Sequence, residues 1–253
     1  MEKYILYPDI KNELMVFVND NDLWKYNVEN KYLERLTNGI GIVTLPRISP
    51  DGKSVYFRLM TGKSADTSDI YSIDIENGKM ERITYLSGNS TSRRMYTSIA
   101  GFDKDNNLIV STDAYYPFGT PMLYKVKNKH LYPLNLGPAL NIIYRNDYVI
   151  LGRNTIDMPH WKHYKGGTRG KILMGRNNNF KITIELDSNI SSPMVLGDRI
   201  YFISDHEGSG NIYSTNLEGN NIKKHTDFTD YYVRNANSDG QSIIFQKMDL
   251  PSY

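Results

Sequence analysis

Residues 44–84 read TLPRISPDGKSVYFRLMTGKSADTSDIYSIDIENGKMERIT. Four short apolar or alternating runs lie in this stretch. The turn triplet Pro50-Asp51-Gly52 separates the first two runs, and Glu76-Asn77-Gly78 separates the last two. Asp-Gly and Asn-Gly supply the positive φ angles that tight hairpin loops require. The stretch therefore predicts four consecutive antiparallel strands, at residues 45–49, 54–60, 69–75 and 80–84.

The same order of turn and strand returns along the whole chain. In each copy the first turn is followed by an apolar strand, and these first turns are expected near Asp9, Asp51, Asp105, Asn146, Gly197 and Asp239. The interval of about 40–50 residues is the size of a four-stranded propeller blade. An all-β sandwich is the alternative, but it does not explain why the same order returns six times.

We therefore expect an all-β fold, a β-propeller of four-stranded antiparallel blades, of the six-bladed type with the sixth blade incomplete. A single propeller domain would span residues 1–253. The predicted blades are about 1–37, 43–84, 96–134, 138–186, 190–226 and, in part, 231–253. An unclosed last blade exposes backbone donors and acceptors at its edge, so we expect the chain to be a fragment or one half of a split gene.

Composition and sequence patterns exclude several classes of partner and of chemical site. The formal charge is +2, with 30 basic and 28 acidic residues scattered along the chain, so a nucleic-acid-binding surface is not expected. The absence of cysteine excludes disulfides, thiolate nucleophiles and cysteine-based zinc sites. No segment has the pattern of a signal peptide or the ~20 apolar residues of a membrane span. We expect a cytoplasmic protein with no nucleic-acid or membrane partner.

Long loops gather at one end of the predicted blades. Antiparallel order places the loops between second and third strands, and the links between blades, at the same end. These are the long, polar segments, at residues 61–68, 85–95, 113–121, 152–170, 205–210 and 227–230. Long loops on a rigid scaffold commonly carry binding residues, so this end is the predicted working surface.

Two cationic features stand out on that surface. Arg93 and Arg94 follow three hydroxyl residues in the link between blades two and three. Adjacent guanidinium groups suit a carboxylate or phosphate, although the pair could instead bind acids of neighbouring loops. The second feature is segment 159–170, with His160, Trp161, His163 and Arg169. Its two histidines have no third ligand placed by the sequence and no helix to align them, so no metal site is predicted.

Catalytic motifs are missing from the sequence. It contains no Gly-x-Ser-x-Gly elbow, no P-loop and no defensible pair of nucleophile and base. We therefore predict no catalytic residue and no cofactor in this chain.

Several non-repeating segments are similar to those of a known family. They include Arg82-Ile83-Thr84-Tyr85-Leu86-Ser87-Gly88, Arg93-Arg94-Met95 and Gly152-Arg153-Asn154-Thr155, with residues 90–91, 100–103, 111–114, 134–139, 159–170 and 224–232. From about Asn12 to its C-terminal end, the chain resembles the N-terminal six-bladed propeller of the tricorn protease family. His163 departs from that family's loop, where glycine is usual.

The resemblance implies a part of a large cytoplasmic serine peptidase that assembles as a homo-hexamer. Such enzymes shorten oligopeptides released by the proteasome, and their catalytic residues lie in later domains, so whether this chain is itself an enzyme stays open. The propeller would form a passage to the reaction chamber. Arg93 and Arg94 match the family's pair that anchors the substrate's C-terminal carboxylate, which favours anchoring over pairing with nearby acids. His160, Trp161 and Arg169 are further candidates on the same surface.

Two other propeller families are alternatives to this resemblance. One is a stand-alone TolB-like propeller that binds proteins or peptides, although that family is exported and no export signal is present here. The other is the propeller of a prolyl-oligopeptidase-like enzyme, whose loops do not match the segments quoted above.

Overall fold

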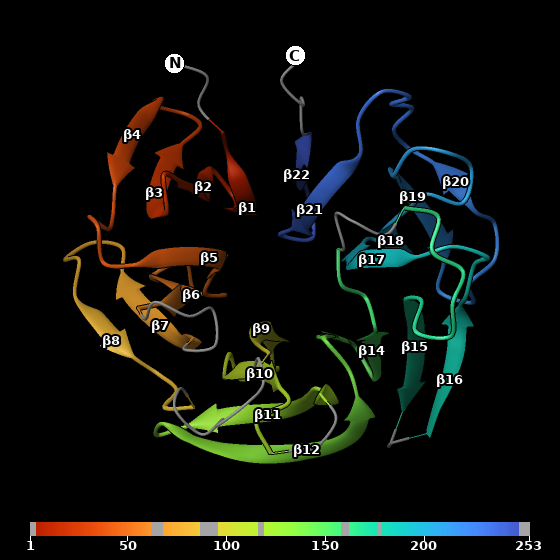
Figure 1. Ribbon diagram of the computed structural model, residues 1–253, viewed down its shortest axis with the longest axis horizontal. Helices are drawn as coiled ribbons and strands as arrows, with labels where there is room; N and C mark the ends of the chain where they lie inside the picture. Colours follow the sequence, from red (N-terminus) through yellow and green to blue (C-terminus); the bar gives the residue numbers. More distant parts are fainter. Residues whose placement is uncertain are drawn as a thin grey trace. The chain divides into compact units, whose positions relative to one another are not determined.

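The computed structural model of the chain describes residues 4–61, 68–86, 96–115, 119–157, 162–176 and 179–247. Its contacts divide the chain into two compact units, residues 1–138 and 139–253, which we call unit 1 and unit 2. Within the described residues the elements are the β-strands β1 to β22, most of which are labelled in Figure 1. No helix in the described part of the chain is long and apolar enough to cross a membrane. The predicted all-β class is confirmed.

Unit 1 contains three four-stranded sheets, which form blades 1 to 3. Blade 1 consists of β1 (Leu6–Lys11), β2 (Leu14–Asn19), β3 (Asp22–Asn27) and β4 (Tyr32–Arg35). Blade 2 consists of β5 (Ile42–Ile48), β6 (Ser54–Met60), β7 (Ser68–Asp74) and β8 (Met80–Arg82). Blade 3 consists of β9 (Thr97–Phe102), β10 (Leu108–Thr112), β11 (Met122–Lys127) and β12 (His130–Pro138). Within each sheet, every strand pairs antiparallel with the next strand in the sequence.

Unit 2 contains two four-stranded sheets and one two-stranded sheet. Blade 4 consists of β13 (Asn141–Arg145), β14 (Tyr148–Arg153), β15 (Lys171–Arg176) and β16 (Asn179–Ile184). Blade 5 consists of β17 (Ile190–Leu196), β18 (Arg199–Ser204), β19 (Asn211–Asn216) and β20 (Lys223–Lys224). The sixth sheet pairs β21 (Val233–Ser238) with β22 (Ile243–Lys247). Five complete blades and an incomplete sixth are the β-propeller organisation predicted from the repeat.

Turn chemistry explains most of these boundaries. Gly52 and Gly78 have φ angles of 73° and 70°, in the left-handed region that favours glycine. The turn expected near Asp9 is wrong, because Asp9 lies inside β1 and is 6% exposed. Its carboxylate Oδ2 accepts a hydrogen bond of 2.7 Å from the backbone N–H of Ile48 in blade 2. The first hairpin turns instead at Asn12, whose φ is 51°.

The first strand of several blades contains an irregularity that the sequence analysis did not predict. The ladder between first and second strand shifts register in β1, β5 and β17, and each shift contains a non-glycine residue of positive φ followed by proline. These dipeptides are Tyr7-Pro8, Leu45-Pro46 and Ser192-Pro193. Proline has no N–H to donate, so it is confined to sheet edges and bulges. The first strand is an edge of every sheet, which makes it a suitable place for this bulge.

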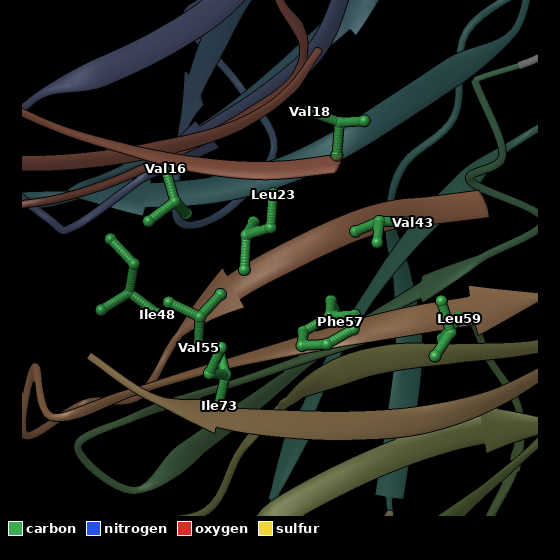
Figure 2. Close-up of a cluster of buried hydrophobic side chains, with 9 residues drawn as sticks. All are labelled: Val16, Val18, Leu23, Val43, Ile48, Val55, Phe57, Leu59 and Ile73. Atoms are coloured by element: carbon green, nitrogen blue, oxygen red, sulfur yellow. The ribbon is translucent and has the colours of Figure 1, made fainter. Parts of the chain in front are cut away.

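The hydrophobic core lies between neighbouring blades. In Figure 2, Val16, Val18 and Leu23 of blade 1 point toward the side chains of blade 2, among them Phe57. A corresponding cluster joins blade 2 to blade 3, and in unit 2 similar clusters join blade 4 to blade 5 and blade 5 to β21. Burying one such side chain stabilises the fold by about 1.5–3 kcal/mol. Within each unit, neighbouring blades are thus held together by these buried side chains.

Candidate functional site

A buried carboxylate organises the loop end of blade 2. Asp69 stands near the start of β7 and is 3% exposed. Its Oδ1 accepts hydrogen bonds from Thr84 Oγ1 (2.6 Å) and from the backbone N–H of Leu86 (2.7 Å). Its Oδ2 accepts one from Arg82 (2.6 Å), whose Nε donates to the carbonyl of Thr84. We call this arrangement the blade clamp, because it ties the third strand to the end of the fourth and to the link that follows.

The blade clamp is repeated in other blades. In blade 1, Asp22 accepts hydrogen bonds from Thr37, Arg35 and the backbone N–H of Gly39. Burial opposes ionisation of Asp22, but these hydrogen bonds outweigh it and hold the pKa of the carboxyl below its ordinary value. In blade 5, the amide oxygen of Asn211 accepts hydrogen bonds from Thr226 and from the N–H of Phe228. Hydrogen bonds therefore hold the backbone at the start of the link that follows each of these blades.

The link between blades 2 and 3 is held at both described ends. It leaves blade 2 at Leu86, on the clamp of Asp69, and enters blade 3 at Tyr96. The N–H of Tyr96 donates to Oδ1 of Asp113 (2.8 Å), and the N–H of Asp113 donates to the carbonyl of Tyr96 (3.2 Å). Arg93 and Arg94, the predicted anchoring pair, belong to this link but lie outside the described residues.

Two further guanidinium groups, which the sequence did not single out, interact electrostatically with Tyr96. Arg47 on β5 has its Nη1 3.9 Å from a carboxylate oxygen of Asp9. Arg58 on β6 interacts electrostatically with Tyr96 and Tyr7, and burial lowers its pKa. Arg58 shares a strand face with Tyr56, whose ring lies 5.7 Å from Phe102 of blade 3. It therefore lies on the face of blade 2 that is turned toward blade 3.

In unit 2, the start of the long segment 152–170 is bonded to blades 4 and 6. Thr155 donates to the side-chain oxygen of Asn141 (2.6 Å). Asp157 forms an ion pair with Arg234 and accepts a hydrogen bond of 2.8 Å from the backbone N–H of Asn235, both on β21. His160 and Trp161, two of the predicted loop candidates, lie outside the described residues.

His163 is fixed against blade 5. Its backbone N–H donates to Oδ2 of Asp205 (2.6 Å), and its Nδ1 lies 3.0 Å from the carbonyl oxygen of Asp205. A carbonyl can only accept, so Nδ1 carries the proton in this contact. The φ angle of His163 is 52°, in the left-handed region that glycine adopts most easily. Asp205 also accepts a hydrogen bond from Ser188.

Arg169 is engaged with the end of blade 4. Its Nη2 donates to Glu185 (2.6 Å), and its Nε donates to the carbonyl of Leu186 (3.1 Å). Lys171 binds the same carboxylate at 2.8 Å, and a hydrogen bond from Lys171 lowers the pKa of Glu185. These contacts give Arg169 a role in holding the segment, and its proposed contact with substrate stays a prediction.

Two hollows in unit 2 are lined in part by residues of the 205–210 loop. A cavity of about 20 Å³, large enough for one water molecule, is lined by Asp157, Asn189, Ser191, Ile203, Ser204, Asp205, Gly210, Tyr232 and Arg234. Burial, the charge of Asp205 and a hydrogen bond to it raise the pKa of Tyr232 to about 12. A second hollow of about 350 Å³ is lined by residues of the 205–210 loop and of the 227–230 link, with His163 at its edge. Both therefore lie among the loops of the predicted working surface.

A serine–histidine contact occurs on blade 5 that the sequence analysis missed. Ser214 Oγ lies 2.7 Å from His225 Nε2, and Arg199 Nε donates to the same oxygen (2.8 Å). Burial lowers the pKa of His225, and so do the charges of Arg199 and Lys223. Ser214 is fully buried, so its hydroxyl is out of reach of a peptide. The contact is a packing feature.

Comparison with known proteins shows to which family the chain belongs. The model of the tricorn protease N-terminal beta propeller domain matches residues 2–250. The chain belongs to this family. The tricorn protease of Thermoplasma volcanium is 48% identical over 247 residues, which are 97% of this chain and 24% of that protein. The crystal structure of the tricorn protease matches with a TM-score of 0.93 at 46% identity, covering 98% of this chain and 24% of that one. This tricorn-type propeller therefore spans about a quarter of the length of these relatives.

One relative is divided between two polypeptides. A tricorn-like protease N-terminal subunit of Sulfurisphaera tokodaii is 33% identical over 178 residues, covering 69% of this chain and 87% of that subunit. The matching C-terminal subunit is 57% identical over 67 residues, covering 26% of this chain and 8% of that subunit. In that organism, the sequence related to this tricorn-type propeller is thus shared by two subunits.

The likeness to TolB is more distant. A TolB-like structure from Agrobacterium tumefaciens has a TM-score of 0.65 at 12% identity, covering 88% of this chain and 81% of that one. At this identity the likeness shows the propeller fold alone.

Proposed function

We propose that this chain is the propeller portion of a tricorn-type cytoplasmic serine peptidase that degrades oligopeptides downstream of the proteasome. The match to the tricorn propeller family along residues 2–250 carries this proposal. In this role the two units act as one propeller domain, which forms a passage to the catalytic chamber. The nucleophile and its base belong to later domains of the intact peptidase.

We further propose that Arg93 and Arg94 anchor the substrate's C-terminal carboxylate. Hydrogen bonds that hold the link on both sides of the pair support this proposal. The buried carboxylates of Asp69 and Asp113 fix Leu86 and Tyr96 by hydrogen bonds of 2.7 Å and 2.8 Å. Two planar guanidinium groups can donate several charge-assisted hydrogen bonds to one carboxylate. Each contributes about 1.5–3 kcal/mol.

Anchoring one end of the peptide selects the bond that is cleaved. A carboxylate held at a fixed place sets the distance from the chain end to a remote nucleophile, so binding energy is used to position the scissile bond. Peptides would then be shortened from the C-terminal end by a defined length. His160, Trp161 and Arg169 are proposed to contact the peptide along the same surface.

The intact peptidase is proposed to be a homo-hexamer in which this propeller works with the remaining domains. The division of the Sulfurisphaera tokodaii relative into N-terminal and C-terminal subunits supports the need for further parts. No metal or cofactor is part of this proposal.

The first prediction compares free and amidated substrates. In the intact peptidase, Arg93→Gln together with Arg94→Gln should raise KM for peptides with a free C-terminal carboxylate by about 100- to 10,000-fold, because two charge-assisted contacts are lost. For the same peptides with a C-terminal amide, KM should change less than about threefold. Steady-state kinetics on matched acid and amide peptides measures both.

A matched control is Arg176→Gln, since Arg176 is an exposed cation stacked on Tyr148 in unit 2. It should leave both KM values unchanged. Equal impairment of acid and amide substrates by the double variant would count against anchoring of the carboxylate.

A further inference from the structure

The clamp of blade 5 differs in its chemistry from the clamps of blades 1 and 2. In all three blades a threonine lies 15 residues after the buried acceptor and donates to it. The residue two positions before this threonine is Arg35 in blade 1 and Arg82 in blade 2, and each pairs with the aspartate of its own clamp. Blade 5 has Asn211 and Lys224 at the corresponding positions. Because the same fold accepts the charged clamp twice in this chain, its geometry does not require the exchange in blade 5.

This exchange directs the charge of Lys224 away from the clamp. Asn211 carries no charge, and its side-chain amide donates to two backbone carbonyls (3.0 and 2.9 Å). Nζ of Lys224 lies instead 2.5 Å from Oδ1 of Asp227 and 4.0 Å from Oε2 of Glu207. A primary ammonium group is thus placed between two carboxylates.

These three charged groups line the hollow of about 350 Å³ in unit 2, and the ring of Phe228 forms part of its wall. Its volume lies in the range of pockets that bind small molecules, ~300–1,000 Å³. Glu207 is held in position because its Oε2 accepts a hydrogen bond of 3.0 Å from the hydroxyl of Tyr213, a residue that is 1% exposed. Burial lowers the pKa of the neighbouring His206, so this imidazole is neutral at pH 7 and adds no positive charge. The hollow therefore presents two carboxylates beside one ammonium group.

We propose that this hollow binds a primary ammonium group of a peptide, which takes the place of the Lys224 ammonium between Glu207 and Asp227. The inference rests on the proposed function only in taking an oligopeptide as the ligand. Ion pairs between exposed side chains are weak, and the flexible four-carbon stem of Lys224 lets its ammonium turn into solvent. Phe228 offers an apolar surface to the aliphatic part of the ligand. Two sources supply this chemistry, the α-ammonium of the peptide N-terminus and the side chain of a lysine.

The test is binding of peptide amides to the 253-residue chain. Each probe is an octapeptide amide that carries fluorescein on a C-terminal cysteine. One has a free α-ammonium and no lysine, another is N-acetylated with a single lysine, and the reference is N-acetylated with norleucine in place of that lysine. Fluorescence anisotropy at pH 7 gives the Kd of each.

We expect at least one of the two ammonium probes to bind about tenfold or more tightly than the norleucine reference. The probe that binds more tightly identifies the source of the ammonium group. Equal binding of all three probes overturns the proposal.

Two variants with opposite expected effects test the carboxylates. Glu207→Gln removes one charge with little change of shape, so the preference for an ammonium probe should fall about fivefold. Asn211→Asp together with Lys224→Arg rebuilds the clamp of blades 1 and 2 and leaves both carboxylates to the ligand, so the preference should rise about threefold. Exposed Glu218→Gln, in the same blade, is the matched control and should equal wild type.

Thermal melts followed by circular dichroism report whether each variant is folded. A folded Glu207→Gln that keeps the wild-type preference overturns the proposal, and so does a folded double variant whose preference does not rise. If Glu207→Gln does not fold, Asp227→Asn decides by the same criterion, because the side chain of Asp227 is 80% exposed and its exchange leaves the fold intact.

The amide ends of the probes separate this inference from the proposed anchoring of the C-terminal carboxylate. An amide lacks that carboxylate, so its binding does not depend on the anchoring pair. Preference for ammonium probes, together with equal KM values for acid and amide substrates of the intact peptidase, keeps the ammonium site and contradicts the anchoring. Preference for acid substrates, with equal binding of the three amide probes, keeps the anchoring and overturns the ammonium site.

Discussion

At the scale of single residues, the loop end of each clamped blade depends on one buried acceptor. Asp69 serves three donors at once: a hydroxyl, a backbone N–H and a guanidinium. In blade 5, the neutral amide oxygen of Asn211 accepts hydrogen bonds from a hydroxyl and from a backbone N–H in the same way. The charge is therefore needed for the arginine, and the acceptor oxygen is needed for the link.

This distinction predicts different costs for two variants of Asp69. Asp69→Ala should lower the free energy of unfolding by about 3–5 kcal/mol, because it leaves a partly buried guanidinium and two donors without their acceptor. Asp69→Asn keeps one acceptor oxygen and should cost about 1–2 kcal/mol. Urea unfolding measures both, with exposed Asp105→Asn as a control expected to stay within about 0.5 kcal/mol of wild type. A loss below about 1 kcal/mol for Asp69→Ala would show that the clamp is dispensable.

Single residues also show where prediction from the sequence reached its limit. The preference for glycine at the position of His163 came from the family resemblance, and its φ of 52° supplies the physical reason. The clamp was not predicted, because its partners lie 13 to 17 residues apart and no local pattern marks their contact. Arg58 stands at an alternating polar position of a strand, which is the pattern of an ordinary solvent-facing residue.

At the scale of elements, the blade is both the repeating unit and the packing unit. The hairpin turns at Gly52 and Gly78 could be predicted because local φ requirements fix them. The bulges of the first strands could not, since Leu45-Pro46 reads as part of a continuous strand. The turn predicted near Asp9 was wrong because a hydrogen bond from the N–H of Ile48, distant in sequence, holds this aspartate inside a strand. Local sequence does not reveal such a contact.

Packing between blades gives a prediction at this scale. Phe57 is fully buried in the cluster shared by blades 1 and 2 (Figure 2), so Phe57→Ala should cost about 3–5 kcal/mol through lost burial and the cavity left behind. Backbone hydrogen exchange should then accelerate in both blades. Exposed Tyr32→Ala in β4 serves as the control, with an expected change within about 0.5 kcal/mol. Acceleration confined to blade 2 would contradict the shared core.

At the scale of the whole molecule, the chain corresponds to about a quarter of its full-length relatives. The repeat predicted five complete blades and part of a sixth, and the strand order confirms this. The candidate site was predictable only in part. Its arginine pair stood out by residue type, and the family resemblance gave the pair its expected anchoring role. The fixed ends of the link came instead from hydrogen bonds between residues 17 positions apart.

A crystal structure of this chain with a bound peptide bearing a free C-terminal carboxylate tests the central claim most directly. The expected result is a terminal carboxylate that accepts hydrogen bonds from Arg93 and Arg94. A peptide bound through its N-terminus or its side chains, with the carboxylate in solvent or on another segment, would contradict the claim.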